Sequence, residues 1–487
     1  MKLGHAGLAI VAASAAGLLA GCLSAPTPSE FSAPWVPPAG VEESDRTWEE
    51  LRAKAPDLSQ PLSLAELTDI ALQNNPVSRR AWNDARAAAA QVERAQGYFM
   101  PSITATAQGV RQHTSASPDE FDKDNFRYGP GLVLNYLVIN FGGGRKAAVE
   151  QALQTVYALD YAFNRSLQDI LLAVERAYYF RISSQAGVLA AESNAQDAKS
   201  TLEAAQARKD AGMGTELDVL QAQARYDQSL YNLAGAQGQF TVAGGTLALV
   251  LGLPADVPVA VAEPATNAPV AFPVEDMRKL IDEALQRRPD LASLRASVAA
   301  REAAITVAAA ALWPSLYLSG SVNRDYYETM SGDAAQDDDW ALSGGVNLQW
   351  LLFDGFQTRG AQRAAIAQAE SERARLEQAE LAAAAEVWTR YYNYETAIRK
   401  GTFSEAYARS AASAYQLALD GYKAGLKSIL DLLTSASQLA NARSQRVASR
   451  QEIFSALADL AHATGTLEQG GAAGTMFPTT AQKEPTL

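Results

Sequence analysis

The most constraining feature of this sequence is an internal repeat. Short segments of the first half recur in the second half 213 positions later, with a slip to 214 between Leu134 and Arg145, and chance matches would not share one offset. The offset relates Pro101-Ser102 to Pro314-Ser315, Ala211-Gly212 to Ala424-Gly425, and Asp218 to Asp431. A repeat at one spacing is the signature of a duplicated structural unit. We therefore divide the chain into two similar repeats, 62–253 and 275–465, joined by a proline-spaced linker at 254–274.

Each repeat begins with an expected helix and continues into two segments in which apolar and small polar residues alternate. In the clearest segment, Leu342, Val346 and Leu348 share one parity, while Ser343 and Asn347 share the other. This period of two predicts β-strands with one apolar and one polar face. Such strands are long enough to cross a bilayer when they are tilted. The expected strands span about 102–112, 127–138, 315–327 and 340–352.

The number of strands limits how they can be used. A soluble sandwich with one solvated face would show the same alternation, but the sequence offers no second sheet for it to pack on. Four strands cannot close a barrel that contains a lumen, and lipid does not tolerate an open sheet edge. If these strands span a membrane, several chains must share one barrel. Aromatic residues lie near the strand ends, where the girdles of membrane barrels occur: Trp313, Tyr317, Trp340, Trp350 and Phe353.

Two proline-free stretches, 144–210 and 359–424, follow the strand pairs and are rich in alanine, glutamine and charge. In the first, apolar residues recur at alternating spacings of three and four, as in a coiled coil. At 1.5 Å per residue, each stretch makes a helix of about 100 Å. Each ends in a glycine-containing turn, and a shorter helix is expected at 215–250 and at 428–463. No compact globular domain accommodates two such rods.

The N-terminus carries a targeting signal. A basic start and a uniformly apolar run indicate a signal peptide over residues 1–21, and Leu19-Ala20-Gly21-Cys22 resembles a bacterial lipobox. The alternative is that Cys22 is an ordinary small residue of the signal. If the lipobox is real, Cys22 is lipidated, and Leu23 after it favours the outer membrane. A proline-rich, extended leader is expected at 22–61, and a disordered tail at 466–487.

Composition excludes several classes of function. Acidic residues outnumber basic ones by 54 to 41, and the formal net charge of −13 argues against a nucleic-acid partner. One cysteine and three histidines leave little material for a metal site. The sequence contains no phosphate-binding loop and no nucleophile motif. We therefore expect no catalytic residues, no metal, no cofactor and no enzymatic activity.

The combination of a lipobox, duplicated strand–strand–long-helix halves and Ala-Gly turns followed by an aspartate resembles the TolC-type outer-membrane factors, and above all their lipidated members. The resemblance covers about residues 62–465. It implies a mainly α-helical homotrimer whose four strands per chain form a twelve-stranded β-barrel, continuing into a coiled-coil periplasmic tunnel. It also implies an outer-membrane exit duct for a tripartite efflux pump or type I secretion system. The implied partners are a periplasmic membrane-fusion adaptor, an inner-membrane RND or ABC transporter, and outer-membrane lipid.

The two turns acquire roles through the same resemblance. As adaptor-docking tips, it implicates Gly212, Met213, Gly214 and Thr215 of the first turn and Gly425, Leu426 and Ser428 of the second. As a periplasmic gate, it implicates Asp218 and Asp431, expected one to two helical turns past the tips, together with Tyr422 and Lys427. Lys427 stands where relatives have an arginine, so the latch is expected to be weaker. The alternative is that these are only helical hairpin turns with solvated charges.

Two other functions remain open on the sequence alone. One is a lipid-anchored structural coiled coil without transport, against which the amphipathic strands speak. The other is a stand-alone diffusion porin, which would not carry helices of about 100 Å. The assembly state and the conductance in lipid separate these alternatives from the duct.

Overall fold

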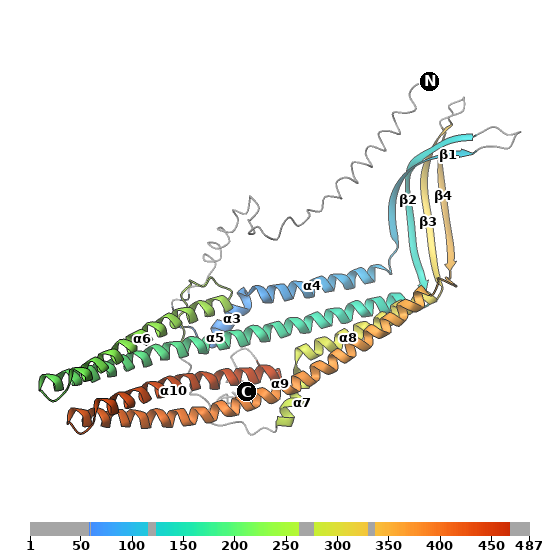
Figure 1. Ribbon diagram of the computed structural model, residues 1–487. Helices are drawn as coiled ribbons and strands as arrows, with labels where there is room; N and C mark the ends of the chain where they lie inside the picture. Colours follow the sequence, from blue (N-terminus) through green and yellow to red (C-terminus); the bar gives the residue numbers. More distant parts are fainter. Residues whose placement is uncertain (1–57, 59, 115–122, 263–276, 330–336, 468–487) are drawn as a thin grey trace, which may run out of the picture. The chain divides into compact units, whose positions relative to one another are not determined.

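The computed structural model describes residues 58, 60–114, 123–262, 277–329 and 337–467. All of them belong to one compact unit, Ala55–Leu487. The described part of the chain contains long helices and one four-stranded antiparallel sheet (Figure 1). The signal peptide, Cys22, most of the leader and almost all of the tail lie outside the described residues, as do most of the 254–274 linker and the tips of both strand hairpins.

The strands run Ser102–Thr114 (β1), Lys123–Asn140 (β2), Ser315–Thr329 (β3) and Asp337–Gln349 (β4), and they lie in the order β1-β2-β3-β4. Each repeat supplies one hairpin, and β2 pairs with β3 to join the two repeats. At this junction Asn140 lies opposite Ser315, and its side-chain amide donates to the Ser315 hydroxyl at 3.1 Å. Among the described residues, β1 and β4 each have a neighbouring strand on one side only.

The two faces of the sheet differ in chemistry. On β4, the apolar side chains are exposed, with Leu342 at 81% and Leu348 at 65%. The opposite face carries small polar groups that bond across strands, as between the hydroxyls of Ser321 and Ser343 at 2.8 Å. Within the described ranges no helix packs across the sheet and no second sheet exists. The soluble sandwich considered from the sequence is therefore excluded for this part of the chain.

The leading helix expected in each repeat is two helices. They span Leu64–Asn74 (α3) and Pro76–Gly97 (α4) in the first repeat, and Met277–Arg287 (α7) and Pro289–Ala309 (α8) in the second. Proline has no amide hydrogen and forces the preceding residue out of helical geometry. Asn75 accordingly adopts a ψ of 125° and Arg288 a ψ of 121°. Each proline ends one helix and begins the next.

The two long helices are equal in length, Gly144–Asp210 (α5) and Gln357–Lys423 (α9), with 67 residues each. The returning helices, Glu216–Val250 (α6) and Ile429–Thr464 (α10), have about half that length. None of the described helices combines the length and the hydropathy that a membrane-spanning helix needs. α10 packs against both α9 and α5, and α5 packs against α6. These four helices therefore lie side by side in the order α6-α5-α10-α9 (Figure 1).

Small residues allow this close packing. Near the turns, the core consists largely of alanines from α5, α6, α9 and α10, including Ala205, Ala222 and Ala442, all fully buried. A second core lies farther from the turns and contains larger side chains, such as Tyr178 and Leu251. The start of the linker closes over that core, because Leu62 forms a parallel bridge with Val261. A third core brings Leu172 of α5 and Tyr394 of α9 together with α10, so the long helices are also held together away from the turns.

Candidate functional site

The candidate site lies where each long helix reverses. In the first turn, Gly212 adopts a left-handed φ of +74°, and the Met213 amide donates to the Arg208 carbonyl at 2.8 Å. The second turn repeats this geometry, with Gly425 at +81° and the Leu426 amide donating to the Gly421 carbonyl at 2.8 Å. Glycine adopts a left-handed conformation without steric cost, which explains its place at both reversals.

The turns project one apolar side chain each. Met213 is 64% exposed and Leu426 is 81% exposed, and both stand beside the left-handed glycine. A single exposed apolar side chain is ordinary on a protein surface. Met213 and Leu426 occupy equivalent positions of the repeat, so the two turns expose a matching pair of apolar side chains.

Both aspartates named from the sequence are capping residues in the first turn of a helix. The Asp218 carboxylate accepts from the Thr215 amide at 3.1 Å, and the Thr215 hydroxyl accepts from the Asp218 amide at 3.2 Å. In the second hairpin, Ser428 donates to the Asp431 carboxylate through its amide at 3.1 Å and its hydroxyl at 2.8 Å. These are reciprocal capping boxes. The aspartates therefore lie nearer the tips than expected and contribute to the turns themselves.

These contacts set the ionisation of Asp431. The pKa of its carboxyl is lowered chiefly by the hydrogen bond from the Ser428 hydroxyl, then by the Ser428 amide, and to a smaller extent by the charge of Lys427. The negative charge is therefore stabilised at the tip. Lys427 therefore acts on Asp431, which belongs to its own hairpin. No hydrogen bond or ion pair joins it to Asp218 within the described part of the chain.

Tyr422 lies between the hairpins. Its side chain is 2% exposed, and among the described residues its hydroxyl has no hydrogen-bond partner. Burial raises the pKa of this phenol, and the negative charge of Asp218 raises it further. Tyr422 and Asp218 are thus brought close together, but the hydrogen bond that the latch would require is not formed in this conformation.

At the tips, Arg208, near the end of α5, bonds to both hairpins; the sequence did not single it out. Its guanidinium donates to the Tyr422 carbonyl and, at 3.2 Å, to the Met213 carbonyl. The Arg208 guanidinium carbon also lies 4.9 Å from the centroid of the Tyr422 ring. A Cβ on Gly425 would come within 3.4 Å of the same guanidinium. Arg208 therefore contacts both turns from one position.

A signal for Arg208 was present in the repeat. The position 213 residues later is Gly421, so the first hairpin has a long cation where the second has no side chain. The Lys427 side chain lies against that glycine, because a Cβ there would be 2.8 Å from its Cγ. The two repeats thus differ at Arg208 and Gly421, and this difference marks the place where the first hairpin reaches over the second.

The family model described as outer membrane efflux protein matches residues 67–253 and 280–466, once in each repeat. The chain belongs to this family. Protein CyaE of Bordetella pertussis is 29% identical over 411 residues, which cover 84% of this chain and 85% of that protein. The pyoverdine export outer membrane protein OpmQ of Pseudomonas aeruginosa is 28% identical over 398 residues, or 78% of this chain and 82% of that protein.

Solved structures agree in fold. The outer membrane protein VceC of Vibrio cholerae superposes with a TM-score of 0.71 at 21% identity, covering 86% of this chain and 98% of that chain. The outer-membrane channel OprN superposes with a TM-score of 0.74 at 23% identity, covering 84% and 90%. The TolC-like fold predicted from the sequence is confirmed. This efflux-family chain is an outer-membrane channel protein, not a structural tether without transport.

The family consists of channel proteins, not enzymes. Among the described residues, no group of three or more histidine, cysteine, aspartate or glutamate side chains could hold a metal ion. The predicted lipidation of Cys22 falls outside the described residues and stays a prediction. The roles assigned to the turn residues are likewise carried into the proposal below.

Proposed function

We propose that three copies of this chain form one duct, with a twelve-stranded barrel in the outer membrane and a helical tunnel in the periplasm. The observation that carries this proposal is the pair of open sheet edges, β1 and β4, on a sheet whose apolar face is exposed. Unpaired backbone groups cost several kcal/mol each in hydrocarbon, so a sheet in lipid must close. Closure by identical chains pairs β4 of one with β1 of the next.

The faces of the sheet support the same arrangement. Leu342, Val346 and Leu348 would meet lipid, while the hydroxyls of Ser321 and Ser343 would line the lumen. Trp340 and Trp350 are 69% and 59% exposed near opposite ends of β4, as interfacial aromatic residues are in membrane barrels. The lipid anchor at Cys22 would add membrane attachment and is not needed for the barrel to insert.

We infer that the duct serves a tripartite pump or a type I secretion system. The tips, Gly212–Thr215 and Gly425–Ser428, would dock a periplasmic membrane-fusion adaptor, which couples the duct to an inner-membrane RND or ABC transporter. Met213 and Leu426 offer the exposed apolar contacts for this docking. The chain itself would perform no catalysis, would need no cofactor and would bind no nucleic acid.

The tip would also be the gate. In a trimer, Asp218 and Asp431 would place six carboxylates in a narrow ring, which favours cations and resists anions. Tyr422 and Lys427 would stand at the contact between the hairpins. Arg208 strengthens this account, because its bonds to Tyr422 and Met213 tie the two hairpins together in the conformation observed here.

Conductance in a planar bilayer tests the proposal. Purified full-length protein should form channels of small, mostly closed conductance, because the tips constrict the lumen. Replacing Asp431 with Asn should reduce the preference for cations, as measured by the reversal potential in a salt gradient. Protein that inserts but shows no conductance would contradict the duct, and a large, permanently open conductance would contradict the gate.

A further inference from the structure

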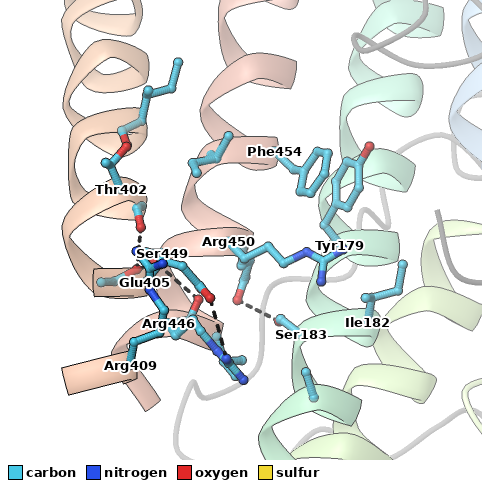
Figure 2. Close-up of a pocket in the computed structure, with 17 residues that line it drawn as sticks. Tyr179, Ile182, Ser183, Thr402, Glu405, Arg409, Arg446, Ser449, Arg450 and Phe454 are labelled. Atoms are coloured by element: carbon cyan, nitrogen blue, oxygen red, sulfur yellow. Dashed lines mark hydrogen bonds and ion pairs between the residues drawn. The ribbon is translucent and has the colours of Figure 1, made fainter. Parts of the chain in front are cut away.

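Outside the tips, the described chain contains a cavity of about 710 Å³ between α5, α9 and α10 (Figure 2). Its size falls within the range of small-molecule sites, about 300 to 1,000 Å³. Figure 2 shows the rings of Tyr179 and Phe454 on one side of the cavity and Arg409 and Arg446 toward the other, while the Arg450 side chain extends between them toward Tyr179. The cavity therefore combines an apolar aromatic wall with cationic side chains.

The cationic lining residues are Arg409, Arg446 and Arg450, all exposed, and Glu405 is the one acidic lining residue. Arg446 approaches Glu405 only to 3.9 Å. Within the described ranges, neither Arg409 nor Arg450 lies within 4.0 Å of a carboxylate. The cavity thus has an excess of positive charge in a chain whose net charge is −13.

Neighbouring acids do not compensate for this excess. Glu452, which follows close on Arg450 in the sequence, forms an ion pair with Lys400 at 2.8 Å. The hydroxyls in the cavity are also engaged, since Ser404 and Ser449 lie 2.6 Å apart and Ser183 donates to Gln451 at 2.7 Å. The arginines are the polar groups that remain available to a ligand.

The apolar wall is closely packed. The rings of Tyr179 and Phe454 stack at 4.5 Å between centroids with an interplanar angle of 12°, and both side chains are buried. Ile453 packs close to α9, because a Cβ on Gly401 would meet its Cδ1 at 2.6 Å. A wall that is already ordered costs little further entropy when a ligand binds.

The cavity is complete within one chain. Its walls come from α5, α10 and α9, and α10 packs against both of the others. Helix α6, at the end of this row of helices, contributes no lining residue. The site therefore needs no group from a second copy.

We propose that this cavity binds an organic anion that combines a carboxylate, sulfonate or phosphate with a compact apolar body. The arginine forks bind the anionic oxygens, since guanidinium groups match such groups geometrically. The body lies against Tyr179, Phe454 and the isoleucines. The inference concerns binding alone, so its failure would leave the proposed duct untouched.

Isothermal titration calorimetry of the full-length protein in a neutral detergent tests the site, with 2-naphthalenesulfonate as the probe and empty micelles as the blank. Saturable binding is expected. The neutral 2-naphthol, which lacks the charge, and methanesulfonate, which lacks the body, should each bind at least about tenfold more weakly, equivalent to about 1.4 kcal/mol.

Charge variants separate the cavity from general attraction. Arg409→Gln with Arg450→Gln should weaken sulfonate binding at least about tenfold. Arg80→Gln with Arg86→Gln makes the same change of charge on α4, away from the cavity, and should leave binding unchanged. Absence of saturable binding, equal binding of the neutral probe, or an equal loss in both double variants would overturn the proposal.

Discussion

At the scale of single residues, Arg208 contacts both hairpins at their tips, and we expect it to hold them together. Replacing it with Gln removes a charged donor from the Tyr422 and Met213 carbonyls. A loss of about 1 kcal/mol corresponds to about a fivefold rise in open probability, measured as single-channel current in a bilayer. Tyr422→Phe is the matched control, because it keeps the ring and the carbonyl that Arg208 contacts.

The control has its own expected result. Since the Tyr422 hydroxyl has no partner in this conformation, Tyr422→Phe should leave the open probability nearly unchanged. If Tyr422→Phe opened the channel as much as Arg208→Gln, the Tyr422 hydroxyl would be needed to keep the tip closed, and the contacts of Arg208 would not explain the closure. Circular dichroism of both variants would show whether the helices remain intact.

Asp431 makes the second turn sensitive to acid. The pKa of Asp431 is lower in the folded protein than in the unfolded chain, where an aspartate titrates near pH 4. The charged carboxylate therefore stabilises the turn above about pH 4, and this stabilisation is lost as the pH falls through the lower pKa of the folded state. Hydrogen exchange of residues 428–432, corrected for intrinsic rates, should therefore show reduced protection below about pH 4. In Asp431→Asn the same decrease should be absent; if it persists, another group is responsible.

At the scale of whole elements, replacing two glycines with alanine, one just before α5 and one inside it, should change the stability of the protein in opposite directions. Gly143 precedes the helix at a φ of +71°, and a Cβ there would touch nothing. Gly143→Ala should lower stability by about 1 kcal/mol, because only the backbone is strained. Gly187 lies inside the same helix, also in open space, and Gly187→Ala should raise stability by about 1 kcal/mol.

Thermal unfolding midpoints measure both changes. The second repeat supplies a natural comparison, because Phe356 occupies the position of Gly143 and adopts a φ of 69°. The protein therefore already accommodates one residue with a side chain in this left-handed conformation, at the start of α9. A stabilising effect of Gly143→Ala would mean that the left-handed start of α5 is not maintained in solution.

The sequence predicts the elements well where local periodicity decides them. Alternation along β4 and the absence of proline in α5 and α9 are local signals, and signals of the same kind occur in both repeats. Pro76 and Pro289 are equally local signals, because a proline forces the residue before it out of helical geometry and so divides each leading helix. The capping partners Thr215 and Ser428 were also readable from composition and spacing.

What the sequence could not show depends on how separate elements pack. Arg208 acquires its role only because α5 lies beside the end of α9, so that its side chain reaches the Tyr422 carbonyl. The arginines of the cavity stay exposed on α9 and α10, and they come to line the same cavity as Tyr179 only because these helices pack beside α5. Contacts between distant segments leave no periodic signal in the chain.

At the scale of the whole molecule, the account depends on how many chains share one barrel. The edges of β1 and β4 are open, and three sheets of four strands would close them. Native mass spectrometry of the detergent-solubilised protein counts the chains in one complex. The account predicts a complex of three chain masses, with no stable monomer. A stable monomer that conducts in bilayers, or a complex of any other number, would contradict it.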